Sequence, residues 1–142
     1  MRKLFYFLLI PAGLAMSGQK AFAGEVVLAM AGPKAEAGDL ENTLYMELED
    51  GRVVIQMRPD LAPNHVSRIK ELVREGFYDG VVFHRVIEGF MAQTGDVKFG
   101  NSSSKNFDLS RAGIGGSDLP DLKQEFNNLP HERGTVSMAR SS

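Results

Sequence analysis

Alternating apolar and polar positions between residues 43 and 57 predict a β-hairpin. Two runs with a period of two are separated by Asp50-Gly51, a pair that favours the positive φ of a tight turn. The apolar positions are Leu44, Met46 and Leu48 in the first run and Val53, Ile55 and Met57 in the second. Such an alternation places one face of each strand against a core and the other toward solvent.

The next apolar pattern has helical spacing and predicts a helix between Pro63 and Gly76. Proline suits the first turn of a helix, and glycine can end one in the left-handed conformation. One stripe is formed by Val66, Ile69, Leu72 and Val73. His65 lies near the helix start, and we expect it to be solvated.

Residues 81–94 contain two runs of β-forming residues that meet at Glu88-Gly89, which predicts a second hairpin. Because successive side chains of a strand alternate between faces, Arg85 shares a face with the apolar Phe83 and Ile87. An unpaired charge is too costly to bury, so two interpretations are open. Arg85 could lie at the surface with its stem over apolar area, or at a cleft where its five donors hold a carbonyl or another acceptor.

The remaining segments are less periodic. Residues 95–129 are dense in Gly, Ser, Asn, Asp and Pro, which is typical of loops. Within them a short helical turn is expected around residues 121–126. Residues 134–139 are predicted to form a strand.

The N-terminus has the three parts of a secretory signal peptide. Arg2 and Lys3 precede an apolar run over residues 4–16, and Ala21-Phe22-Ala23 has the small-x-small pattern of a signal peptidase site. An uncleaved membrane anchor is the alternative, but the run is shorter than the roughly 20 residues that a spanning helix needs. We therefore expect a signal peptide at 1–23, a flexible leader at 24–40 and one domain at 41–142.

Composition and motif spacing argue against several classes of functional site. Removal of residues 1–23 leaves 13 of the 16 basic residues against 18 acidic ones, a net charge of −5, without the basic cluster that nucleic acid requires. The absence of cysteine excludes disulfides and a cysteine nucleophile. The three histidines lack metal-ligand spacing, and no G-x-S-x-G motif marks a serine nucleophile. We expect no metal, no cofactor and no nucleic-acid partner.

One stretch is specific enough to indicate a family. The sequence FHRVIEGFMAQTGD, at 83–96, closely resembles the signature of the cyclophilin-type peptidyl-prolyl isomerases. Supporting matches include RGTVSMAR at 133–140 and GIGGSDLPDLKQEF at 113–126, of which the second is similar to bacterial members. The resemblance extends from about Asn42 to the last residue.

The resemblance implies a mainly β fold, an eight-stranded antiparallel β-barrel closed by two helices, with the active site in an outer groove. Arg140 stands where many members have asparagine. The implied site consists of Arg85 as the catalytic residue and of Phe90, Met91, Gln93, Ala139 and Arg140 as substrate-binding residues, with Phe90 and Met91 forming the proline pocket.

The implied chemistry suits these residue types. An X–Pro bond isomerises slowly because twisting it breaks amide resonance, a barrier of roughly 18–20 kcal/mol. No bond is made or broken, so no nucleophile is needed. An arginine aimed at the amide nitrogen or the neighbouring carbonyl stabilises the twisted amide more than the planar one.

Family members continue beyond SMAR with a further strand, more groove residues and a second helix. We therefore expect a barrel that is incomplete at the C-terminus and a chain that is the N-terminal part of a longer product. The first functional hypothesis is a periplasmic or secreted isomerase, a monomer that acts on proline-containing peptides and unfolded proteins and has no membrane association after signal removal. The alternative is a proline-peptide binding module or inactive fragment that lacks the second half of the groove.

Overall fold

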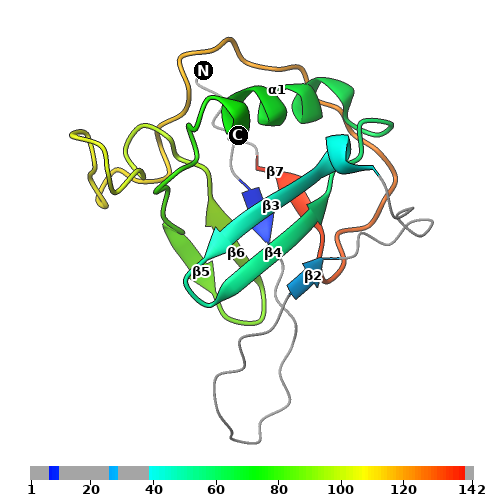
Figure 1. Ribbon diagram of the computed structural model, residues 1–142, viewed down its shortest axis with the longest axis horizontal. Coiled ribbons are helices and arrows are strands. Elements are labelled where there is room, and N and C mark those ends of the chain that lie inside the picture. The colour runs from blue at the N-terminus through cyan, green and yellow to red at the C-terminus, as the bar shows by residue number, and fades with distance from the viewer. Residues whose placement is uncertain (1–6, 10–25, 29–38, 140–142) are drawn as a thin grey trace, which may run out of the picture.

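Two small β-sheets and one α-helix make up the part of the chain that the computed structural model describes, residues 7–9, 26–28 and 39–139 (Figure 1). One sheet has the strand order β5-β6-β1-β7, and the other has the order β2-β4-β3. The elements are β1 (Phe7–Leu9), β2 (Val26–Leu28), the 3-10 helix η1 (Leu40–Asn42), β3 (Thr43–Leu48), β4 (Gly51–Gln56), α1 (Pro63–Arg74), β5 (Arg85–Ile87), β6 (Met91–Thr94) and β7 (Val136–Met138).

The hairpin predicted from the alternating pattern is confirmed as β3 and β4. The strands pair antiparallel from Thr43 opposite Gln56 to Leu48 opposite Gly51, and Gly51 has the positive φ of 142°. Val53 and Ile55 are each only 5% exposed, and Leu44, Met46 and Val136 pack against them. The buried face of the hairpin is therefore the one that the sequence pattern indicated.

The predicted helix is confirmed as α1, with Pro63 in its first turn. Gly76 follows the helix in the left-handed conformation, at a φ of 72°, where a residue with a side chain would be strained. Ile69 and Leu72 of the apolar stripe are 4% and 2% exposed. Figure 1 shows α1 lying across one end of the β3–β4 hairpin, so that its apolar stripe closes that end of the core.

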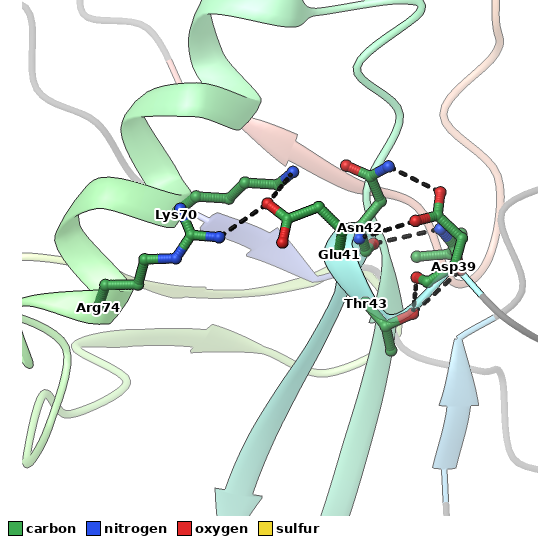
Figure 2. A network of polar contacts seen from close by, with 7 residues as sticks. Asp39, Glu41, Asn42, Thr43, Lys70 and Arg74 are labelled. Carbon is green, nitrogen blue, oxygen red and sulfur yellow. Dashed lines mark hydrogen bonds and ion pairs between the residues drawn. The ribbon is translucent and has the colours of Figure 1, made fainter.

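Ionic contacts join the start of the domain to α1. Figure 2 shows Lys70 and Arg74 extending from α1 toward Glu41, whose Oε1 lies 3.1 Å from Lys70 Nζ and 2.7 Å from Arg74 Nη2. The carboxylate of Asp39 caps η1 by accepting hydrogen bonds from the Asn42 backbone N–H at 3.2 Å and from Asn42 Nδ2 at 2.7 Å. Glu41 and Arg74 are exposed to solvent, whereas the Lys70 side chain is only 15% exposed. An exposed ion pair such as Glu41–Arg74 contributes at most about 1 kcal/mol.

The second predicted hairpin is confirmed in its central part. β5 and β6 pair antiparallel around the turn 88–90, and Gly89 has a φ of 72°. The strand is shorter than the apolar run 81–87, because only an isolated bridge joins Val81 to Asn101 before β5 begins. The predicted strand at 134–139 is present as β7 at its centre.

The described residues do not form the closed barrel that the resemblance implied. They form two open sheets, and α1 is the single α-helix among them. The helical turn expected at 121–126 is also wrong, because that segment has no regular secondary structure and Glu125 holds it against the start of α1. Tertiary contacts there override a local helical preference.

Most of the expected signal peptide and flexible leader lies outside the described residues. Of the segment 1–23 the structure describes Phe7–Leu9, which forms β1 between β6 and β7. Of the segment 24–40 it describes Val26–Leu28, which pairs parallel with β4, and the residues from Asp39 onward. Across the described ranges, no helix has the length and apolar character required to cross a membrane.

Candidate active site on the second hairpin

The β5–β6 hairpin places Arg85 directly opposite Gln93. Residues directly opposite each other in an antiparallel pair project their side chains from the same face of the sheet. The backbone N–H of His84 donates to the carbonyl of Gln93 at 3.1 Å, which extends the pairing one residue beyond the strand. The register therefore fixes a guanidinium and a primary amide side by side.

Arg85 is exposed, although it shares its face with the buried Met91. This exposure is compatible with both interpretations of the sequence, a surface arginine whose stem covers apolar area and an arginine at a cleft. Within the described part of the chain, its guanidinium makes no hydrogen bond or ion pair. None of its five donors is therefore used by another described residue.

Phe90 and Met91, which the resemblance assigns to one proline pocket, have different environments. Phe90 lies in the turn and is 55% exposed, whereas Met91 at the start of β6 is only 1% exposed. The N–H of Phe90 donates to the carbonyl of Ile87 at 3.1 Å, which fixes the turn. The aromatic ring is thus accessible at the turn of the hairpin that carries Arg85, and the thioether forms part of the interior.

β7 lies in the same sheet as the hairpin but is not adjacent to β6. β1 separates them, with Leu8 opposite Gln93 on one side and opposite Ser137 on the other. Ala139 directly follows β7 and is half-buried, and Arg140 lies outside the described residues. The structure therefore brings Arg85, Gln93 and Phe90 together on one hairpin and places Ala139 two strands away.

A cavity of about 310 Å³ lies elsewhere, between α1, the β3–β4 hairpin, β7 and the segment 122–129. Its walls are mainly apolar and include Leu44, Ile69 and Val136. Ala139 lines it, but Arg85 and Phe90 do not. It is consequently a partly open pocket on the β3–β4 side of the domain, and the exposed Phe126 contributes to its lining.

A buried carboxylate beside the hairpin is a site residue that sequence reasoning missed. Asp96 is 0% exposed, and it accepts hydrogen bonds from the backbone N–H groups of Lys98, Phe99, Gly113 and Gly115 at 2.7–2.9 Å. Burial raises the pKa of this carboxyl, but the four hydrogen bonds outweigh burial and hold the pKa below its ordinary value. Its contacts with residues 98 and 99 are a local turn of the kind that aspartate favours.

His84 connects this region to the arginine. Its imidazole is half-buried, and burial lowers its pKa, an effect that Asp96 opposes and the neighbouring Arg85 charge adds to. Gly113 lies against this ring, because a Cβ at that position would come within 3.0 Å of His84 Cδ2. The imidazole therefore separates the hairpin from the loop that carries Gly113.

The expectation that His65 is solvated is wrong. Its side chain is 13% exposed and its Nδ1 lies 2.5 Å from Oε2 of Glu125. Glu125 also accepts from the backbone N–H of His65 and of Asn64, both at 3.0 Å, and from Asn64 Nδ2 at 2.6 Å. Since Ala62 supplies no side-chain cap, this distant carboxylate caps the N-terminus of α1. No pattern within the helix sequence identifies a cap that comes from another segment.

In the described ranges, no three or more histidine, aspartate or glutamate side chains are grouped as a metal site would require. The candidate chemistry thus rests on the arginine, the amide and the aromatic ring of one hairpin. A positive charge, a polar neighbour and an exposed apolar ring suit the binding of a peptide carbonyl beside an apolar side chain.

Comparison with protein families identifies the class. Residues 43–142 match the model of the family described as cyclophilin type peptidyl-prolyl cis-trans isomerase. The match covers the β3–β4 hairpin, α1, the Arg85 hairpin and β7. The chain belongs to this family.

Curated relatives carry the same description. The chain is 64% identical over 107 residues to a protein of Brucella suis named as a probable peptidyl-prolyl cis-trans isomerase, an alignment covering 75% of this chain and 54% of the relative. It is 34% identical over 100 residues to peptidyl-prolyl cis-trans isomerase B of Bacillus subtilis, covering 70% and 62% of the two chains. A third relative, peptidyl-prolyl cis-trans isomerase B of Escherichia coli, is 37% identical over 92 residues, covering 64% and 49%.

The chain spans about half the length of the Brucella relatives that it matches. No solved structure matches it.

Proposed function

We propose that this chain is a peptidyl-prolyl cis-trans isomerase that accelerates rotation about X–Pro bonds and assists the folding of exported proteins. The observation that carries the proposal is one hairpin of a chain that belongs to the cyclophilin-type family. It places the exposed Arg85 opposite the half-buried Gln93 and carries the exposed Phe90 in its turn. Its substrates are proline-containing peptides and unfolded proteins.

The mechanism requires no covalent step. When the X–Pro bond twists, resonance is lost and the proline nitrogen becomes a hydrogen-bond acceptor. The Arg85 guanidinium donates to this nitrogen or to the neighbouring carbonyl and stabilises the twisted amide more than the planar one, which lowers the barrier of roughly 18–20 kcal/mol. Gln93 holds the peptide backbone beside the arginine, and Phe90 contacts the pyrrolidine ring.

The buried position of Met91 supports a more limited role than its assignment to a proline pocket. Met91 forms the floor beneath the hairpin, and Phe90 provides the apolar contact at the surface. Ala139, which follows β7 two strands from β6, and Arg140 stay proposed substrate contacts on the resemblance to the family alone. Because Arg85 uses only hydrogen bonding and charge, the reaction needs neither metal nor cofactor.

An exchange measurement on a short X–Pro peptide tests the proposal. NMR exchange cross-peaks between the cis and trans peptide are compared with and without the full 142-residue chain, and with its Arg85→Ala variant. We expect the loss of one transition-state donor to lower kcat/KM about 100-fold. Arg52→Ala is the matched control, because Arg52 is an exposed arginine on β4 that pairs with Glu47 at 2.6 Å.

A rate of exchange that is the same for the chain and for Arg85→Ala would contradict the catalytic role. The alternative function, a module that binds proline peptides without catalysis, is favoured by the burial of Met91, which leaves a shallower apolar contact. Its signature is a shift of peptide resonances on titration with no gain in exchange rate. The same experiment therefore separates the two functions.

The N-terminal sequence supports an exported location, periplasmic or secreted. Arg2 and Lys3, the apolar run and the Ala21-Phe22-Ala23 site have the composition of a signal peptide. Mass spectrometry of the protein recovered after export should give an N-terminus at Gly24. Recovery of the intact N-terminus in the membrane fraction would instead indicate an anchor.

A further inference from the structure

Asp96 is a fully buried charge whose hydrogen bonds reach two separate loops. Oδ1 accepts from the backbone N–H of Lys98 at 2.9 Å and of Phe99 at 2.8 Å, and Oδ2 accepts from those of Gly113 at 2.7 Å and Gly115 at 2.9 Å. A carboxylate has about four acceptor sites, so these four donors satisfy it. Such complete satisfaction makes a buried charge tolerable.

Asp96 is also connected to the hairpin through the chain itself. Asp96 follows the end of β6 at Thr94 by two residues. The hydroxyl of Thr94 donates to the carbonyl of Val82 at 2.9 Å, and the carbonyl of Asp96 accepts from the N–H of Gly100 at 3.1 Å. The strand that carries Gln93 is therefore fixed at the end where Asp96 lies.

Asp96 is connected to the hairpin a second time by non-covalent contacts, through Gly113 and His84. Asp96 holds the N–H of Gly113, and Gly113 lies against the ring of His84 so closely that a Cβ there would come within 3.0 Å of Cδ2 and 3.2 Å of Nε2. His84 precedes Arg85 in the chain, and its N–H pairs with Gln93. Asp96 consequently acts on both strands of the hairpin, on β6 through the chain and on β5 through Gly113 and His84.

From this geometry we infer that Asp96 is a positioning residue for Arg85: it holds the loop that contains Gly113 against His84, and so fixes the strand that presents the guanidinium to the peptide. Asp96 itself does not touch the substrate. The inference rests on the proposed function, because it assigns a role in that reaction. The charge strengthens the hydrogen bonds to the loops, since a charged acceptor binds a backbone N–H about twice as strongly as a neutral one.

The substitution Asp96→Asn tests the inference with little change in volume. An amide replaces one acceptor oxygen by an NH₂ group, which opposes a backbone donor instead of accepting from it. In the peptide exchange assay we expect kcat/KM to fall about 10–100-fold, the effect of misplacing a catalytic group by an ångström or less. The fall should lie mainly in kcat, because the interaction with Arg85 that is lost belongs to the twisted state.

A double-mutant cycle distinguishes positioning from a general loss of structure. If Asp96 acts through Arg85, Asp96→Asn has no further effect on the residual rate of Arg85→Ala. If the substitution merely lowers the folded fraction, it reduces the rate by the same factor in both backgrounds. Equal factors would overturn the inference while leaving the function itself in place.

Asp108→Asn is the matched control. Asp108 also accepts from a backbone N–H, that of Ser110 at 3.0 Å, but this hydrogen bond and the one from Ser110 Oγ at 2.6 Å both stay within the loop 97–112. Its substitution should leave kcat/KM unchanged. A loss equal to that of Asp96→Asn would mean that the rate responds to any disturbance of the loop, and would contradict the inference.

Gly113→Ala provides a second variant in case Asp96→Asn does not fold. It leaves the carboxylate intact but pushes on His84, and Gly113 has a φ of 101° that a side chain disfavours. As with Asp96→Asn, we expect Gly113→Ala to lower the rate of the parent chain but not the residual rate of Arg85→Ala. Failure of the unsubstituted chain to catalyse exchange or bind the peptide would overturn the proposed function, and this inference with it.

Discussion

Glu125 and His65 are 60 positions apart in the sequence, yet their side chains lie 2.5 Å apart and are 12% and 13% exposed. Glu125 also accepts from two backbone N–H groups at the first turn of α1. One carboxylate therefore joins the irregular segment 121–126 to the helix and neutralises the positive end of the helix dipole. Arg68 adds a second connection, since its Nη1 donates to the carbonyl of Pro120 at 3.0 Å.

This contact predicts a specific acid sensitivity. Burial raises the pKa of Glu125, but the hydrogen bonds from His65 and Asn64 outweigh it and lower the pKa from 4.5 to about 2. A carboxyl with a depressed folded-state pKa contributes stability that is complete above about pH 4.5 and is lost as the pH falls toward 2. Glu125→Gln should therefore lower stability at pH 7 by about 1–3 kcal/mol and make it less dependent on pH within that window.

Urea denaturation at several pH values measures this difference. Glu49→Gln, in the exposed turn between β3 and β4, is the control and should leave the stability at pH 7 within about 0.5 kcal/mol of the parent. The prediction fails if the parent and Glu125→Gln lose stability in parallel between pH 4.5 and 2.

Phe90 and Met91 are neighbours with opposite expected effects. Met91→Ala should cost about 2–5 kcal/mol in free energy of unfolding, because the side chain is 1% exposed and leaves a cavity. Phe90→Ala, at 55% exposure, should leave stability within about 0.5 kcal/mol and weaken the binding of a proline peptide. Denaturation curves and peptide titrations of both variants check this, and an unchanged peptide affinity of folded Phe90→Ala would exclude the ring from the site.

Two adjacent glycines provide a test of the packing around Asp96. A Cβ at Gly115 would lie 2.5 Å from Asp96 Oδ1 and 2.7 Å from Phe99 Cδ2, whereas a Cβ at Gly116 would meet nothing within 4 Å. Gly115→Ala should cost about 1–3 kcal/mol, and Gly116→Ala should be neutral or stabilise by up to about 1 kcal/mol. Thermal unfolding of the two variants gives the comparison. Equal midpoints would show that the loop moves away without cost.

Two leucines allow a matched measurement of the core. Leu72 of α1 is 2% exposed and Leu109 of the loop is 65% exposed. Leu72→Ala should lower the free energy of unfolding by about 2–5 kcal/mol, and Leu109→Ala should change it by less than about 0.5 kcal/mol. Urea denaturation checks both. Similar losses at the two positions would mean that α1 contributes little to the cooperative core.

Short-range patterns in the sequence predicted the helix, the strands and the turns that are set by neighbouring residues. The alternation in β3 and β4, the helical stripe of α1 and the turn at Gly89 are properties of short segments, and the structure confirms them. The β-forming runs on either side of Glu88-Gly89 also predicted the arginine hairpin, whereas the roles of Arg85 and Gln93 were implied only by the resemblance to a family. The register of Arg85 opposite Gln93 follows from the turn length.

Contacts between distant segments could not be predicted in this way. The cap that Glu125 provides to α1 and the bonds of Asp96 to Gly113 and Gly115 depend on how loops cross the core. The burial of Met91 likewise depends on what covers the hairpin, since strand parity only assigns it to the face that it shares with Arg85.

The hydrogen bonds of Asp96 go to backbone N–H groups alone, which has a consequence for sequence divergence. Every residue except proline supplies such a donor, so these hydrogen bonds place no demand on the side chains at 98 and 99. Burial and space restrict other positions, because Phe99 is 7% exposed and a Cβ at Gly100, Gly113 or Gly115 would come within 3.0 Å of another atom. Loops fixed in this way can exchange their outward residues without altering the path of the chain. Related proteins could therefore acquire different peptide preferences around an unchanged arginine, and loop libraries built on residues 98–112 could select for them.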